Sequence, residues 1–345
     1  MGAGRLNSMQ NGKKRIAIAL QGGGSHGAFS WGILERLLEE DLFSFRGFCG
    51  TSAGAMNGAI AAYGLHTAGN RGAIELLKKF WKKVSAVNSV YNQGTLTHAL
   101  REDGDLFYSM GFQWFNLISQ TFSPYQFNPL DINPLRDILN ELIDFEELKN
   151  SKVKLFSCAT NVKTCKPRVF HLHEMSVEAL LASACLPQLY KAVEINGAYY
   201  WDGGFMGNPP IYPLIDHTDS NDILLLKVNP ISIQHVPQTV AEIQDRVNDI
   251  SFNSSLMAEM RMIYFKEKIF KMGINLKGKL RKINFHAVSA DDTMQDFSLS
   301  SKFNASWRFI NKLRHLGRAC AEQWIKDHFD KVDRESSVDI RKVFL

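Results

Sequence analysis

The stretch Cys49-Gly50-Thr51-Ser52-Ala53-Gly54-Ala55 lies between a short apolar run, which predicts a strand, and an alanine-rich segment, which predicts a helix. Glycines two positions before and after Ser52 leave room for a sharp strand-to-helix turn. Such a turn would expose the serine hydroxyl and direct the N-terminal end of the helix at any negative charge that develops there. We therefore interpret Ser52 as a candidate nucleophile, carried on a turn made by Gly50, Thr51, Ala53 and Gly54.

A glycine-rich loop precedes this turn. The apolar run Ile16–Leu20 predicts a strand, and the amphipathic pattern from Ala28 to Leu38 predicts a helix. Between them the sequence reads Gln21-Gly22-Gly23-Gly24-Ser25-His26-Gly27. Consecutive glycines let backbone N–H groups point in one direction, as an oxyanion hole requires. We expect Gly23 and Gly24 to supply the donors, with Gly22, Ser25 and Gly27 completing the loop.

Asp202, further along the chain, is the candidate partner of the serine. An aromatic run leads into Asp202-Gly203-Gly204, and the two glycines give the carboxylate close access to its neighbours. Asn196-Gly197 predicts a hairpin turn that delivers Asp202 at the end of a strand. Asp202 is thus the candidate general base. Burial beside Trp201 and Phe205 would raise its pKa from an ordinary value of about 4.

Together, these three stretches resemble the patatin-like phospholipase family. The family signatures are Gly-Gly-Gly-x-Arg/Lys-Gly, Gly-x-Ser-x-Gly, and Asp-Gly-Gly or Asp-Gly-Ala. Here they stand in the same order at Gly22–Gly27, Gly50–Gly54 and Asp202–Gly204, and the resemblance covers roughly residues 15–214. One position departs from the family pattern: His26 replaces the usual Arg or Lys, and a histidine is only partly charged near neutral pH.

The resemblance implies a serine lipid acyl hydrolase of the phospholipase A or lysophospholipase type, acting on phospholipid or lysophospholipid. It also implies a Ser52/Asp202 dyad without histidine, in which Asp202 accepts the serine proton, an acyl-Ser52 forms, and Asp202 then activates water. We expect no cofactor and no metal, because no Asp/Glu cluster in the sequence resembles a calcium loop.

The rest of the chain predicts an α/β fold, with a mainly parallel central sheet flanked by helices and a largely helical C-terminal extension. The nucleophile would lie at the carboxyl edge of this sheet. Strand-like segments are Phe43–Cys49, Val153–Ala159, Arg168–Leu172, Asp222–Val228 and Ile283–Val288. Helix-like segments are Ala53–Tyr63, Ala73–Trp81, Leu135–Ile143, Ser176–Cys185, Thr239–Met272 and Lys302–Phe329.

Four parts are predicted along the chain: a flexible N-terminus (1–14), a catalytic domain (15–228), a helical extension packed on or near it (229–330), and a tail (331–345). From Val84 to Asn128 the pattern breaks into an aromatic-rich segment, which predicts either a lid or acyl groove or an aromatic core under a loop. The helix Lys302–Phe329 carries a basic face and an apolar stripe, which consists of Phe303, Trp307, Ile310, Leu313, Leu316, Cys320 and Trp324. It either covers the core or lies on anionic lipid.

Composition narrows the partners and the location. The chain of 345 residues is long enough for a sizeable core, and its net charge of +5 favours anionic surfaces weakly without indicating a nucleic-acid binder. Five scattered cysteines fit buried thiols in a reducing compartment. We see no secretory signal and no run approaching the ~20 apolar residues of a membrane span. We expect a cytoplasmic protein, peripheral at the inner face of the membrane, for which self-association stays open.

Three other interpretations are open. Gly22–Gly27 also satisfies the dinucleotide pattern Gly-x-Gly-x-x-Gly, although the acidic run that follows, Glu39-Glu40-Asp41, ends a helix instead of a second strand. A Ser-His-Asp esterase of the ordinary α/β-hydrolase kind would recruit a later histidine. The available histidines are His217, His235, His286 and His315. The third interpretation is a membrane-binding or partner-binding module without activity on the same fold.

Overall fold

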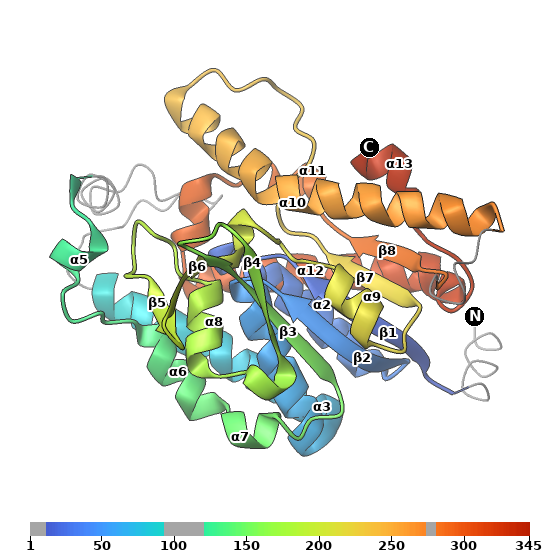
Figure 1. The fold of residues 1–345 in the computed structure, drawn as a ribbon, viewed down its shortest axis with the longest axis horizontal. Coiled ribbons are helices and arrows are strands. Elements are labelled where there is room, and N and C mark those ends of the chain that lie inside the picture. Colours follow the sequence, from blue (N-terminus) through green and yellow to red (C-terminus); the bar gives the residue numbers. More distant parts are fainter. Residues whose placement is uncertain (1–11, 93–120, 274–280) are drawn as a thin grey trace.

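The computed structural model describes residues 12–92, 121–273 and 281–345. In these ranges an eight-stranded sheet forms the centre, in the order β5-β6-β3-β2-β1-β7-β8, with β4 paired to β3 (Figure 1). Strands β3, β2, β1, β7 and β8 run parallel, whereas β4, β5 and β6 are antiparallel additions. The strands are β1 (Lys14–Leu20), β2 (Phe43–Gly50), β3 (Lys154–Asn161), β4 (Pro167–His171), β5 (Val193–Ile195), β6 (Ala198–Asp202), β7 (Asp222–Leu226) and β8 (Asn284–Val288).

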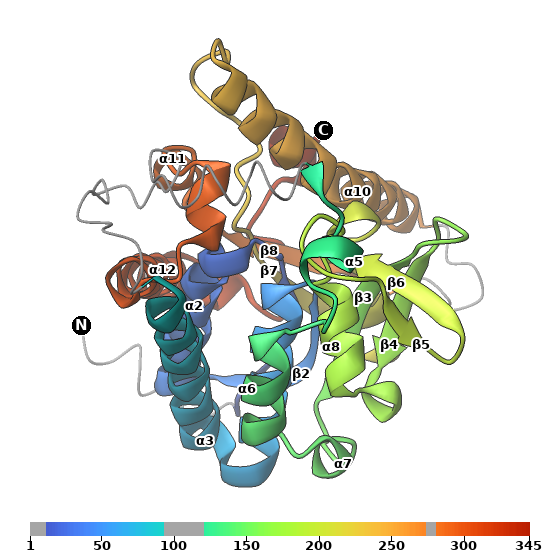
Figure 2. The ribbon, with the colours of Figure 1, turned by 90° about the vertical axis from the view of Figure 1, so that its left-hand side faces the viewer.

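Helices cover both faces of this sheet, so the predicted α/β class is confirmed. Figure 2 shows α2 and α12 on one side of β7 and β8, and α10 on the other. The helices are α2 (Gly27–Glu40), α3 (Ala53–Asn92), α5 (Pro124–Phe127), α6 (Pro134–Leu142), α7 (Phe145–Leu148), α8 (Val177–Ser183), α9 (Tyr212–His217), α10 (Val240–Lys271), α11 (Asp291–Met294), α12 (Trp307–His328) and α13 (Ile340–Phe344).

Strand β1 shows how the sequence divides the core. Its side chains alternate between faces, as in any strand. Ile16, Ile18 and Leu20 join a cluster built with α2, α3 and α12. Ala17 and Ala19 join a second cluster built with α9, α10 and α13. Both faces are therefore buried, which explains why the predicted parallel strands are uninterrupted apolar runs.

The helix after Ser52 is longer than the sequence indicated. The two predicted helices Ala53–Tyr63 and Ala73–Trp81 form one element, α3, with a break in helical geometry at Ala68 and Gly69. This helix continues to Asn92, so the expected loss of regular structure at Val84 was wrong. Most of the predicted aromatic lid, residues 93–120, lies outside the described residues.

Helix α12 covers the core, as one of its two interpretations predicted. It crosses α2 closely, because a Cβ at Gly317 would lie 2.0 Å from the Phe29 carbonyl oxygen. Part of its basic face pairs with α2: Arg314 contacts Glu35, and Arg318 contacts Glu35 and Glu39. The predicted stripe was partly wrong, since Trp307 is 36% exposed. The buried residues of α12 are Phe309, Ile310, Leu313, Gly317, Ala321 and Trp324.

The last part of the chain contributes to the same sheet and cores. Strand β8, from the predicted extension, pairs with β7, and Ile340 and Phe344 of α13 are buried in the second cluster. Across the described ranges, every helix is too short or too polar to cross a membrane.

Candidate active site

Ser52 lies on a sharp turn between β2 and α3. Its φ of 55° is in the left-handed region, which a residue with a side chain rarely adopts. Both flanking glycines are required by close approaches. A Cβ at Gly50 would lie 2.4 Å from the Gly54 carbonyl carbon, and a Cβ at Gly54 would lie 2.3 Å from the Leu20 carbonyl oxygen. The Gly-x-Ser-x-Gly pattern thus has a steric cause in this fold.

Neighbouring groups hold the turn in place. The Ser52 N–H donates to the Ser183 hydroxyl (2.9 Å), which comes from α8. The Thr51 hydroxyl donates to the Gly207 carbonyl (2.6 Å), in the segment that follows Asp202. The side chain of Ser52 is left partly exposed at the N-terminal end of α3, as the sequence predicted.

Asp202 lies at the end of β6 and is 1% exposed. Its carboxylate forms a side-chain hydrogen bond with Ser52 and accepts the N–H of Gly204 at 2.6 Å. Burial raises the pKa of Asp202 to about 7, and the bonds from Gly204 and Ser52 oppose this rise. Gly203 and Gly204 permit this placement, because Cβ atoms there would lie 2.1 Å from the Cys158 carbonyl oxygen and 2.2 Å from the Phe252 ring.

The glycine loop runs beside the serine. A Cβ at Gly22 would lie 2.9 Å from the Ser52 Cβ, so only glycine allows this approach. The Gly22 N–H, however, donates to Asn208 Oδ1 at 2.7 Å. Gly22 therefore positions the loop. Its N–H is already engaged, so it is not a free donor for the oxyanion, although the sequence placed Gly22 in the oxyanion loop. Within the described parts of the chain, the N–H groups of Gly23 and Gly24 have no acceptor.

The second half of the loop is anchored from both sides. Gly24 has a φ of 56° and packs against the Lys302 carbonyl, where a Cβ would approach to 2.3 Å. Ser25 is buried. A Cβ at Gly27 would lie 2.7 Å from the Ala53 Cβ, so this glycine lets α2 approach the start of α3.

His26 takes no charged role. It is 2% exposed, and its Nε2 is 2.7 Å from the Ser301 hydroxyl. Its ring centroid lies 5.8 Å from that of Phe297 and 6.2 Å from that of Phe309. Burial, assisted by the nearby Lys302, lowers the pKa of His26 well below its usual value. A neutral histidine thus ties the glycine loop to residues about 270–285 positions later in the chain.

Four buried polar side chains near the loop were not identified from the sequence. Gln21 Oε1 accepts the N–H groups of Val228 (2.9 Å) and Asn229 (3.0 Å), and Asn229 Nδ2 donates to the Gly22 carbonyl at 3.0 Å. The other two are Asn208 and Ser183, described above. The role of Gln21 could have been predicted from the sequence, because a polar residue directly after a buried strand needs hydrogen-bond partners inside the protein.

The family comparison agrees with this geometry. Residues 18–215 match the family model described as patatin-like phospholipase. The chain belongs to this family. A search of curated proteins returned no match. Membership in the patatin-like phospholipase family indicates a lipid acyl hydrolase.

The histidines of this patatin-like protein do not complete a triad with Ser52 in the contacts of the described residues. His286 instead lies between Asp222 (Nε2 to Oδ1, 3.0 Å) and Ser337 (Nδ1 to Oγ, 3.0 Å). His217 packs against the rings of Phe156 and His171. The carboxylate of Asp202 contacts the serine directly.

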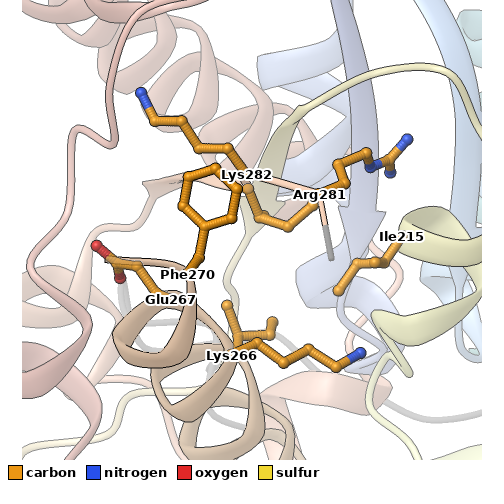
Figure 3. Close-up of a pocket in the computed structure, with 8 residues that line it drawn as sticks. Ile215, Lys266, Glu267, Phe270, Arg281 and Lys282 are labelled. Atoms are coloured by element: carbon orange, nitrogen blue, oxygen red, sulfur yellow. The ribbon is translucent and has the colours of Figure 1, made fainter. Parts of the chain in front are cut away.

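In the described residues, the acidic run that follows the glycine loop is already paired with cations. Glu39 and Asp41, near the end of α2, are engaged by Arg318 and Lys13. Among the described residues, no group of three or more His, Cys, Asp or Glu side chains is arranged to hold a metal ion. A small cleft does occur between α9, the C-terminal half of α10 and the segment that leads into β8 (Figure 3), but neither Ser52 nor Asp202 lines it.

Proposed function

We propose that this patatin-like protein hydrolyses fatty-acyl esters of phospholipids or lysophospholipids, with Ser52 as the nucleophile and Asp202 as the general base. The hydrogen bond between the Ser52 hydroxyl and the buried Asp202 carboxylate carries this proposal. It joins a serine on a strained turn to a base whose pKa of about 7 suits proton transfer at neutral pH.

In the proposed reaction, Asp202 accepts the Ser52 proton while Oγ attacks the ester carbonyl. The negative charge that develops on the carbonyl oxygen is stabilised by the N–H groups of Gly23 and Gly24 and by the N-terminal end of α3. Asp202 then returns the proton to the departing alcohol, which leaves an acyl-Ser52. Water, deprotonated by Asp202, releases the fatty acid and regenerates the serine.

Family membership and the surface beside the dyad support the proposed substrate class. Phe205 and Met206 come directly after the Asp202-Gly203-Gly204 turn, and each is 39% exposed. Apolar side chains at this position suit an acyl chain or a lipid surface. We include peripheral association with the cytoplasmic side of a membrane in the proposal, with no cofactor and no metal.

Labelling with a fluorophosphonate probe, together with fatty-acid release from phosphatidylcholine and its lyso form, tests the proposal. We expect wild type to label and to release fatty acid. The Ser52→Ala variant should not label, and it should lose about 10³-fold or more in rate. The Asp202→Asn variant should lose about 10²-fold to 10⁴-fold in kcat, as expected for removal of a general base.

Two variants separate the remaining alternatives. His217→Ala and His315→Ala should keep the wild-type rate, whereas a Ser-His-Asp esterase that used one of these histidines together with Asp202 would lose its activity in that variant. A wild-type protein that folds normally but neither labels nor cleaves any ester, with or without lipid vesicles, would refute catalysis and favour a binding module.

A further inference from the structure

Two buried asparagines hold the backbone of Gly22, one on its N–H and one on its carbonyl. The Gly22 N–H donates to Asn208 Oδ1 at 2.7 Å, and Asn229 Nδ2 donates to the Gly22 carbonyl at 3.0 Å. Asn208 is fully buried and Asn229 is 1% exposed, so neither bond is open to water. The peptide groups on both sides of Gly22 are therefore fixed in direction.

The fold brings Asn229 to this loop because β7 lies beside β1 in the sheet (Figure 1). The two strands run parallel, with Leu20 opposite Leu226, so the segments that follow them leave the sheet at the same edge. Gln21 joins these segments, because its N–H donates to the Leu226 carbonyl (3.2 Å) and its Oε1 accepts the Asn229 N–H (3.0 Å). The sheet thus sets the position of Asn229 beside the loop.

The bond from Asn229 determines where the next N–H of the loop points. A trans peptide is planar, and its C=O and N–H point in opposite directions. The Gly22 carbonyl and the Gly23 N–H belong to one peptide, so the Gly23 N–H points away from Asn229. The next peptide is held in a similar way, because the Gly23 carbonyl accepts the His26 N–H at 3.1 Å and turns the Gly24 N–H away from His26.

Ser52 lies on the side of the loop to which the Gly23 N–H is turned. A Cβ at Gly22 would lie 2.9 Å from the Ser52 Cβ. A Cβ at Gly23 would instead lie 3.0 Å from Val228 Cγ2 and 3.8 Å from Asn229 Oδ1. The loop therefore separates Ser52 from Asn229, and a group that points away from Asn229 points to the side of the serine.

We propose that Asn229 is a positioning residue of the oxyanion loop, which directs the Gly23 N–H toward the substrate oxygen that becomes negative when Ser52 attacks. It acts through the Gly22 carbonyl and does not itself contact the substrate. This role rests on the proposed function. The loop needs such a support, because a peptide between two glycines has more conformational freedom than a peptide between residues with side chains.

Without the Asn229 amide, the Gly22 carbonyl would be left buried without a hydrogen bond, which costs free energy. Rotation of the peptide between Gly22 and Gly23 relieves this cost by turning the carbonyl toward the open site. The same rotation replaces a donor with an acceptor at the oxyanion position. It would oppose the developing negative charge and slow the chemical step, while substrate binding stays unchanged.

Steady-state kinetics of fatty-acid release by the Asn229→Leu variant tests the proposal. Leucine has nearly the shape of asparagine but carries no donor. Loss of one oxyanion donor costs about 10²-fold to 10³-fold, so we expect kcat to fall about 10²-fold while KM changes less than about threefold. Asn229→Asp is a second variant of the same shape. Its ionised carboxylate cannot donate at pH 9, where kcat should fall at least about tenfold.

Asn284→Leu is the matched control. Asn284 is 2% exposed, and its Nδ2 makes one hydrogen bond, to Asp222 Oδ1 at 3.1 Å. Like that of Asn229, its Oδ1 is buried without a partner among the described residues. It begins β8, at the edge of the sheet opposite to Ser52. This variant should lose stability, but its kcat should stay within about twofold of the wild-type value.

Binding of two ligands separates positioning from a general loss of structure. An alkylboronic acid forms a tetrahedral anionic adduct with a reactive serine and so resembles the transition state. An ether analogue of lysophosphatidylcholine has no ester carbonyl to stabilise. Asn229→Leu should bind the boronic acid at least about tenfold more weakly than wild type, and the ether analogue equally well. An equal loss for both ligands would indicate general damage to the site and would overturn the proposal.

The kinetic results distinguish failure of this role from failure of the proposed function. A wild type that releases no fatty acid would refute the proposed function, and the role of Asn229 with it. An active wild type whose kcat falls less than about fivefold in Asn229→Leu would refute the role alone. A comparable loss of kcat in Asn284→Leu would do the same. If the leucine variant does not fold, the same limit applied to Asn229→Asp at pH 9 decides.

Discussion

At the residue scale, the burial of Asp202 has two effects. It makes the carboxylate a stronger base, and it lowers the stability of the folded protein when the carboxylate is ionised. A carboxylate whose pKa rises from 3.8 to about 7 on folding is more stable neutral than ionised in the native state. Its favourable contribution is complete below the pKa of the unfolded chain, and it is lost as the pH rises through about 7. The proposed base form of Asp202 is the major form only above that pH.

We expect the rate of ester hydrolysis to rise with pH through about 7, where Asp202 ionises. The Asp202→Asn variant removes the ionisation and should unfold less readily than wild type at pH 8, by about 1 kcal/mol or more. At pH 5 the difference should be smaller, and it should disappear only below the unfolded pKa of 3.8. Urea unfolding at the two pH values measures this. Equal stabilities at pH 8 would show that the carboxylate is not desolvated as described.

His26 gives a second prediction at this scale. Restoring the usual family residue with His26→Arg would bury a cation beside Lys302 without a carboxylate in contact, so stability should fall by about 2 kcal/mol or more. Ser301→Ala keeps the ring and removes its partner, together with the hydrogen bond from the Ser301 hydroxyl to the Ser298 carbonyl (2.7 Å), so it should cost about 1 kcal/mol or more. Thermal unfolding of both variants provides the check. A His26→Arg protein as stable as wild type would contradict the conclusion that His26 is buried and neutral.

At the scale of elements, the crossing of α2 and α12 is set by two glycines. A Cβ at Gly32 would lie 2.0 Å from the Arg314 carbonyl oxygen, and a backbone atom cannot move away as a side chain can. Gly32→Ala should therefore destabilise the protein by about 1–3 kcal/mol through overpacking, although alanine is the better helix former. Gly58→Ala, where the nearest atom is the Phe48 Cβ at 3.2 Å, should cost less. Denaturant midpoints compare the two.

Elements and motifs could be predicted from the sequence wherever the cause is local. The turn at Asn196-Gly197 depends on two neighbouring residues, and the structure confirms it. The length of α3 could not be predicted, because the sequence beyond Val84 lacks a clear helical periodicity although the helix continues there. The buried face of α12 was partly misassigned, since it depends on the crossing with α2.

In the candidate site, too, locally determined features could be predicted and long-range contacts could not. Short motifs contain Ser52, Asp202 and their glycines, so the sequence identified them. The bond from Gly22 to Asn208 joins residues 186 positions apart, and the contact of His26 with Ser301 spans 275. Such pairings depend on the assembled sheet and have no local pattern. The sequence therefore named the residues of the candidate site but not the long-range contacts that hold them in place.

At the scale of the whole molecule, the first strand of the described chain contacts residues from the last part of the sequence. Asp222, at the start of β7, accepts hydrogen bonds from Asn284 (3.1 Å) and from the backbone of Asp333 (2.9 Å). Lys14, at the start of β1, donates to the carbonyls of Phe329 (2.8 Å) and Val332 (2.9 Å). These contacts join the strands of the first two-thirds of the chain to its last residues.

We expect the described chain to unfold in one cooperative transition, and a truncation after Val228 to remain unfolded. The truncation removes β8, α10 and α12, and so exposes β7 and one face of α2. Calorimetry of the full chain and circular dichroism of the truncated chain measure the two outcomes. A folded, active fragment 1–228 would show that the catalytic part is autonomous.

The support of the glycine loop by Ser301 and Lys302 has a consequence for biosynthesis. Chains are made from the N-terminus, so Ser52, Asp202 and the loop leave the ribosome well before the residues that hold the loop in shape. If the loop needs this support, a nascent chain carries the reactive serine without a formed oxyanion site. Ester cleavage would then begin only after synthesis of the C-terminal part, which would protect nearby lipids from incomplete molecules.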